Sequence, residues 1–146
     1  MRPTLSVLAI LSLGLVGVSC GGSDPVGSGG GPPGGGREIK ADPSFSSDIQ
    51  EIFTRKGCTA SGCHGSASQG GLDLRPSAAY GELVNVAAQG EDKIRVIPGD
   101  AQNSYLVIKL EGRQSFGSQM PEGGTPLDNI DLTNVRNWIT RGALNN

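Results

Sequence analysis

Two thiols and one imidazole lie within seven consecutive residues of this chain. Four residues separate Cys58 from Cys63, and His64 follows the second cysteine directly. This order is typical of covalent haem attachment, in which each thiol adds to one vinyl group and the adjacent imidazole binds the iron. The common motif has a shorter spacer between its cysteines, and the longer spacer is a variant of it. We therefore predict one haem c, held by both cysteines, with His64 as an axial ligand.

Two other interpretations of the same residues stay open. In an oxidising compartment Cys58 and Cys63 can form a disulfide, which would leave His64 as a surface residue. The three side chains can also bind zinc, but a structural zinc site needs a fourth ligand. Once Cys20 is assigned to the membrane anchor described below, no other Cys or His remains, so a carboxylate would have to complete that site.

A second axial ligand is suggested by a methionine count. Met1 is lost with the N-terminal signal, which leaves Met120, in a Gly-rich loop and directly before Pro121. Six-coordinate c-type haem commonly binds one His and one Met, so we predict Met120 as the distal iron ligand. Pro121 favours an extended backbone at the preceding residue, which would direct the thioether. The alternative is a methionine that fills a gap in the core.

The elements around these residues predict a small all-α domain with long loops. The last helix has the clearest signals, because Asp128 is a favourable N-cap and Gly142 ends the helix. Its apolar face carries Leu132, Val135, Trp138 and Ile139. Three shorter helices are expected at 48–55 after Ser46 or Ser47, at 76–84 from Pro76, and at 101–111 after Asp100, with an extended run at 94–97.

The order of these features resembles class I c-type cytochromes, and more narrowly the cytochrome c domains of planctomycetes. The resemblance implies attachment through Cys58 and Cys63, His64 as proximal ligand and Met120 as distal ligand. One departure is Glu122, where a second proline often follows the Met-Pro pair. The stretches that carry the likeness are IQEIFTRKGCTASGCHG, GGLDL, VIPGDAQNSYLVIKL, QMPEGGTPL and VRNWITRGAL.

A cytochrome interpretation also assigns the apolar residues near these motifs. Six side chains are candidates for the wall of a haem pocket, with ordinary core packing as the alternative for each: Leu72, Leu74, Ile97, Pro98, Leu106 and Trp138. A backbone carbonyl between Leu72 and Pro76 is expected to accept the free imidazole N–H. Gly65, Gly70 and Gly71 are expected to let the backbone approach the porphyrin.

The N-terminus has the order of an export signal. Arg2 precedes an apolar stretch, Leu5–Val18, which is too short for a stable membrane span. Small residues then lead to Cys20, as in bacterial lipoprotein signals, so we predict a signal at 1–20 with Cys20 lipidated, or otherwise an ordinary signal peptide. A Gly/Pro-rich flexible linker at 21–40 and a cytochrome c domain at 41–146 complete the predicted organisation.

Composition limits the function further. The chain has 12 basic and 14 acidic residues, so it lacks the electrostatic footprint of a nucleic-acid-binding protein. It has 24 glycines but only three Phe, two Tyr and one Trp. A buried haem would supply the bulk that aromatic side chains do not, and we expect the domain to fold poorly without it.

The function expected from these observations is single-electron transfer. A monohaem cytochrome at the periplasmic or cell-surface side, held to a membrane by a lipid anchor, would exchange electrons with other redox proteins without being an enzyme itself. The alternatives are a haem domain with an open or labile distal site, acting as a peroxidase-like enzyme or as a gas or redox sensor. A third is an accessory haem subunit of a dehydrogenase complex.

Overall fold

The computed structural model describes residues 37–146, and the predicted signal, Cys20 and most of the predicted linker lie outside that range. Within it, β pairing is limited to three isolated bridges, Val84–Val96, Ala87–Ile94 and Ile97–Asp100. No helix of this range is long and apolar enough to cross a membrane. The elements in chain order are η1 (Phe45–Ile49), α1 (Gln50–Arg55), η2 (Gln69–Gly71), α2 (Ala79–Leu83), α3 (Tyr105–Glu111) and α4 (Asn129–Thr140).

The first helical segment begins earlier than the sequence predicted. A π-helical turn, η1, runs directly into α1, and the residue before it is Ser44 rather than Ser46 or Ser47. The side chain of Asp48 accepts a hydrogen bond of 2.8 Å from the backbone N–H of Ser44, which satisfies a donor at this helix end. The cap is therefore made from within the first turn.

The two central helices are shorter than predicted. α3 has Ser104 before its first residue, so Asp100 is not its N-cap. Asp100 instead closes a separate turn, in which its carboxylate accepts hydrogen bonds from the N–H and the amide group of Asn103. α2 begins at Ala79, after a turn in which the Ala79 N–H donates to the carbonyl of Arg75, so Pro76 lies in that turn and not in the helix.

The predicted cap of α4 is confirmed. The carboxylate of Asp128 accepts a hydrogen bond of 3.1 Å from the N–H of Asp131, and the helix ends two residues before Gly142. The side chain of Asp131 has other partners. Its carboxylate, only 2 % exposed, pairs with Arg55 at 2.8 Å and Arg37 at 3.0 Å. A second role of this first turn is thus to hold two arginines from outside α4.

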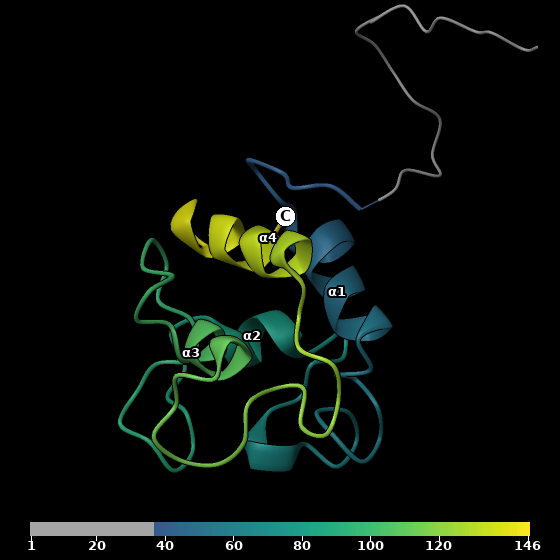
Figure 1. The fold of residues 1–146 in the computed structure, drawn as a ribbon, viewed down its shortest axis with the longest axis vertical. Helices are drawn as coiled ribbons and strands as arrows, with labels where there is room; N and C mark the ends of the chain where they lie inside the picture. The colour runs from purple at the N-terminus through teal and green to yellow at the C-terminus, as the bar shows by residue number, and fades with distance from the viewer. Residues whose placement is uncertain (1–36) are drawn as a thin grey trace, which may run out of the picture. The chain divides into compact units, whose positions relative to one another are not determined.

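The core joins α4 to the N-terminal helical segment (Figure 1). Trp138 is 1 % exposed, its ring lies 5.1 Å from that of Phe45, and its indole N–H donates to the Leu144 carbonyl. Tyr80 meets Phe45 edge to face at 5.2 Å between ring centres. Half of the chain's few aromatic rings therefore meet at one place, and the apolar packing around them includes Ile49, Ile52, Phe53, Leu83, Val96, Val107, Leu110, Val135 and Ile139.

Residues 37–40, which the sequence placed in the linker, are bound to α4. The amide of Asn134 accepts from the Lys40 N–H and donates to the Glu38 carbonyl, both at 2.8 Å. Asn137 donates to the Lys40 carbonyl at 2.7 Å. Because two asparagine side chains satisfy this backbone, residues 37–40 belong to the folded part and not to the linker.

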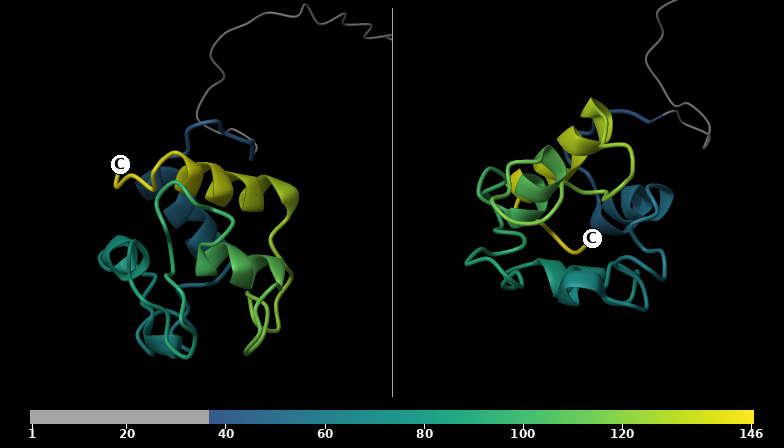
Figure 2. Two further views of the ribbon diagram at one scale, coloured as in Figure 1. Left: turned by 90° about the vertical axis from the view of Figure 1, so that its left-hand side faces the viewer. Right: turned by 60° about the horizontal axis from the view of Figure 1, so that its bottom comes forward.

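The segments that carry the predicted haem ligands lie together on one side of the helices. In Figure 1 the chain after α1, the η2 turn and the loop between α3 and α4 all lie on the side away from α4. The left view of Figure 2 shows the same arrangement, with η2 and the α3–α4 loop toward opposite edges of that region. The helical core thus supports both ligand-bearing segments from the same side.

Candidate functional site

The loop that carries both cysteines is folded tightly onto the end of α1. Gly57 has φ of 74°, and the Cys58 N–H donates to the Phe53 carbonyl at 2.9 Å. The His64 N–H then donates to the Cys58 carbonyl at 3.0 Å. The loop therefore closes on itself and brings the imidazole residue back to the first cysteine, despite the longer spacer.

This closed loop explains Gly65. A Cβ atom at Gly65 would lie 2.3 Å from the carbonyl oxygen of Thr59 and 2.7 Å from that of Ala60. Contacts this short involve backbone atoms, which cannot turn aside as a flexible side chain would. Gly65 is required by the loop's own path, whereas the sequence analysis related it to a porphyrin. Gly70 and Gly71 are required by φ values of 64° and 62°.

The two thiols are free and differ in environment. Cys58 is half-buried and packs against the hydrophobic core, and burial raises the pKa of its thiol. Cys63 is exposed. The disulfide alternative is therefore not formed in this structure. Among residues 37–146, no three His, Cys, Asp or Glu side chains are close enough to one another to hold a metal ion, so the zinc alternative gains no support.

His64 is held at its backbone and at its ring. Its carbonyl accepts from the Leu74 N–H at 2.6 Å, and its Nδ1 atom lies 2.9 Å from the carbonyl oxygen of Gln69. A carbonyl can only accept, so Nδ1 is the donor in this contact and Nε2 is the ring nitrogen that the contact leaves unengaged. The sequence analysis expected such a carbonyl between Leu72 and Pro76, and the structure places it at Gln69, in η2.

Met120 is fixed to the end of α3. Its N–H donates to the Lys109 carbonyl at 2.9 Å, and the neighbouring Gln119 amide donates to the Leu110 carbonyl at 2.8 Å. The peptide bond between Met120 and Pro121 is cis. The Met120 side chain is partly buried and packs against the same core as Cys58. Both side chains therefore pack against the hydrophobic core, from different parts of the chain.

The six predicted wall residues divide into three groups. Leu74 and Trp138 belong to the buried core itself, at 3 % and 1 % exposure. Leu72 and Leu106 are partly buried against that core, as Cys58 and Met120 are. Ile97 is half-buried and Pro98 is exposed, in a turn that the Gly99 N–H ties to the end of α4. Leu72 and Leu106 are thus the two that share the environment of the predicted ligands.

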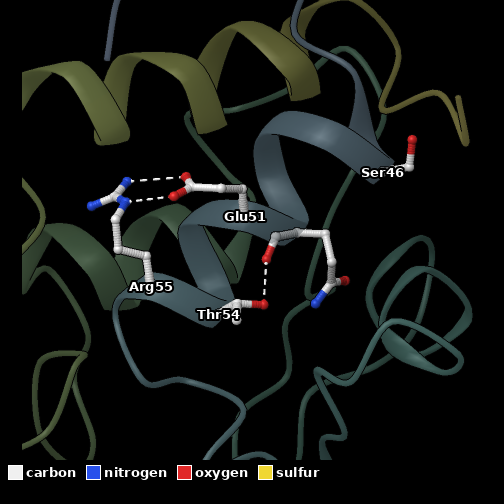
Figure 3. Close-up of a pocket in the computed structure, with 5 residues that line it drawn as sticks. Ser46, Glu51, Thr54 and Arg55 are labelled. Atoms are coloured by element: carbon white, nitrogen blue, oxygen red, sulfur yellow. Dashed lines mark hydrogen bonds and ion pairs between the residues drawn. The ribbon is translucent and has the colours of Figure 1, made fainter. Parts of the chain in front are cut away.

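Two surface hollows lie elsewhere, along α1. Figure 3 shows the first, where Arg55 donates to Glu51 at 2.7 Å and the Thr54 hydroxyl donates to the Gln50 carbonyl. The second lies between α1, α4 and residues 37–40. Neither is lined by a cysteine, a histidine or a methionine. Their ion pairs and hydrogen bonds join residues of the chain to one another and do not indicate a ligand.

Sequence reasoning missed three residues that hold this region together. Gln69 supplies the carbonyl for His64, and the buried Gln50 amide donates to the Leu74 carbonyl at 2.8 Å. Arg95 is buried and bonds to the backbone of η2. Only Arg95 had a signal in the sequence, since it is the single charge within the apolar run Ile94–Ile97.

No family model, curated protein or solved structure matches this chain. The donor set of residues 58–64 and 120 must therefore be judged on its own chemistry. It offers two free thiols, an imidazole with Nε2 available and a thioether, with Cys58 and Met120 against the same apolar core. These are the donor types that a covalently attached, six-coordinate haem uses.

Proposed function

We propose that this chain is a monohaem c-type cytochrome that carries single electrons between redox proteins outside the cytoplasm. The observation that carries the proposal is the state of His64. Its Nδ1–H is engaged by Gln69, so Nε2 is the free nitrogen, and the residue directly follows a free thiol. An imidazole ligand of haem needs that tautomer, with its second nitrogen hydrogen-bonded.

Attachment of the group uses only the two thiols. Cys58 and Cys63 would hold the group covalently, because each S–H would add across one vinyl C=C bond, forming a C–S bond and leaving the hydrogen on the neighbouring carbon. No external oxidant or reductant enters this addition. The partial burial of Cys58 raises the pKa of its thiol.

Bound haem supplies the one-electron exchange between ferric and ferrous iron. His64 Nε2 and the Met120 sulfur would hold the iron, and a thioether ligand would favour the ferrous state. The Met120 backbone is tied to α3 and its side chain to the core, so the sulfur is held without a bond to iron. Leu72 and Leu106 are partly buried against the same core.

The site of action follows from the N-terminal sequence. A signal at 1–20 with a lipid on Cys20 would export the chain and hold it at a membrane, and the Gly/Pro-rich segment would let the folded part reach its partners. A Cys20→Ser variant is expected to remain haem-bound but to leave the membrane fraction. Membrane retention of that variant would contradict the proposed anchor.

Potentiometry on the exported protein tests the proposed function. We expect a low-spin spectrum, a reversible one-electron titration and no binding of carbon monoxide to the reduced protein, because both axial positions are filled. Rapid carbon monoxide binding, or turnover of peroxide, would replace electron transfer with an open-site function. A colourless protein, with no haem attached, would favour the interpretation in which Cys58 and Cys63 form a disulfide.

A further inference from the structure

Arg95 is a buried cation that binds the η2 turn, close in the chain to the predicted ligand His64. The residue is 6 % exposed and lies in an otherwise apolar extended run. Its backbone N–H donates to the Val86 carbonyl at 2.8 Å, and its neighbour Val96 makes a bridge to Val84. A buried arginine carries a large desolvation cost unless its donors are matched by well-placed acceptors.

The guanidinium group meets four acceptors from two separate segments. Nη2 donates to the carbonyls of Gly71 at 2.8 Å and Gly70 at 3.2 Å. Nη1 donates to the carbonyl of Glu82 at 2.8 Å and to its carboxylate at 3.2 Å. Three of the four acceptors are backbone oxygens, so this arginine mainly fixes chain geometry and is not simply one half of an ion pair.

The backbone that Arg95 holds is the turn that orients His64. Gly70 and Gly71 follow Gln69 directly, and the Gln69 carbonyl is the acceptor of the His64 Nδ1–H. Both glycines have positive φ and no residue of η2 is buried. The turn's own hydrogen bonds run from the Gln69 N–H to the Cys63 carbonyl at 3.0 Å and from the Gly71 N–H to the Ser68 carbonyl at 2.8 Å. Those two hydrogen bonds stay within residues 63–71, and the guanidinium group ties the backbone next to Gln69 to the buried Arg95.

We propose that Arg95 is a positioning residue for the axial histidine. It clamps the Gly70 and Gly71 carbonyls, which keeps the Gln69 carbonyl on His64 Nδ1–H and so keeps Nε2 presented to iron. The inference rests on the proposed function. A lysine cannot replace the arginine here, because an ammonium group lacks the planar fork that reaches two neighbouring carbonyls and Glu82 together.

Hydrogen exchange of the His64 Nδ1–H tests the clamp. In the reduced haem protein, NMR should show exchange at least about tenfold faster in Arg95→Gln than in the wild type, since a charge-assisted contact that limits local opening is gone. Arg95→Lys keeps a cation but not the fork, so it should also exchange faster. It gives the same comparison if the glutamine variant does not fold.

Arg113→Gln is the matched control. Arg113 also donates to a backbone carbonyl, that of Gln102 at 3.1 Å, but lies at the end of α3 and holds no part of η2. In this variant the His64 Nδ1–H should exchange at the wild-type rate. Equal rates in Arg95→Gln, Arg95→Lys and Arg113→Gln would overturn the positioning role.

The same variants separate this inference from the proposed function. In haem-free protein, the imidazole ¹⁵N shifts report which nitrogen of His64 carries the proton. We expect the Nδ1–H form to lose population in both Arg95 variants and to be unchanged in Arg113→Gln. That result would support the clamp even if no haem were ever attached, and unchanged shifts in the Arg95 variants would overturn it.

Discussion

The Nδ1 atom of His64 lies 2.9 Å from the carbonyl oxygen of Gln69, five residues further along the chain. His64 is the only histidine of the chain, and because the carbonyl has no proton to give, Nδ1 is the donor in this contact. This contact also makes the available nitrogen the one that faces away from its own backbone. The contact therefore leaves Nε2 as the nitrogen that the proposed iron ligation would use.

Met120→Ala is expected to remove the sulfur ligand without unfolding the chain, because Met120 is only partly buried. The charge-transfer band of iron–sulfur ligation should disappear and the reduction potential should fall. Gln119→Ala is the control, since it removes only the hydrogen bond to Leu110. An unchanged band in Met120→Ala would exclude this methionine as the distal ligand.

Trp138→Ala should lower the free energy of unfolding by about 3–5 kcal/mol, because it empties a fully buried site. Trp138 packs on Phe45 and donates to the Leu144 carbonyl, so its role is in the core. We expect the reduction potential of the folded variant to stay the same. Denaturant unfolding measures the first effect, and a large potential shift would restore Trp138 as a wall of the haem pocket.

Phe116→Ala provides the comparison for that measurement. The Phe116 side chain is 71 % exposed, so removing it should change the free energy of unfolding by no more than about 0.5 kcal/mol. A similar loss in both variants would mean that aromatic burial does not explain the stability of this core.

Gly65→Ala should destabilise the cysteine loop by about 1–3 kcal/mol and lower the yield of attached haem, because its Cβ would collide with the Thr59 carbonyl. Gly62→Ala is the matched control in the same loop, where a Cβ meets nothing within 4 Å. Haem stain per milligram of exported protein measures the yield. Equal yields in the two variants would argue against the closed loop.

The stability of the folded part should depend on pH through Asp128. Its carboxylate accepts hydrogen bonds from Arg37 and from the Asp131 N–H. These bonds, the one from Arg37 most of all, lower the pKa of the carboxyl to about 2. The unfolded chain has the higher pKa and binds the proton first, so this contribution is complete above about pH 4 and is lost as the pH falls toward 2. Denaturant titrations across this range should show the decline.

Asp128→Asn should reduce that acid dependence while keeping an N-cap, because asparagine caps helices as well as aspartate does. Asp92→Asn changes an exposed carboxylate away from α4 and serves as the control. If the two variants lose stability with acid equally, the Arg37–Asp128 contact does not contribute.

Sequence signals predicted correctly those features of the fold that depend on residues close together in the chain. The α4 cap was predicted from Asp128, since its partner Asp131 is three residues away. Asp100 gave the same signal but closes a different turn, because a capping aspartate stabilises any suitable turn and does not specify a helix. The cysteine loop and Met120 were predicted to hold haem from residue type and order alone.

The supports of the candidate site depend on contacts between distant residues. Arg95 reaches Gly71 across 24 residues, and Gln50 reaches Leu74 across the same separation. Pattern reasoning registers neither, since no period or motif links them. Residues 37–40 were misplaced for a similar reason, because asparagines almost a hundred positions away bind their backbone. Composition suggested a linker there, and tertiary contacts override it.

The central claim is the covalent attachment of one haem to Cys58 and Cys63, and a mass measurement tests it most directly. The protein is exported in cells that carry haem-attachment machinery, denatured and cleaved, and the peptide containing Cys58–His64 is weighed. We predict a mass increase of one haem in the wild type and none when both cysteines are replaced by alanine. A wild-type peptide without haem, with its thiols free or joined as a disulfide, would contradict the account.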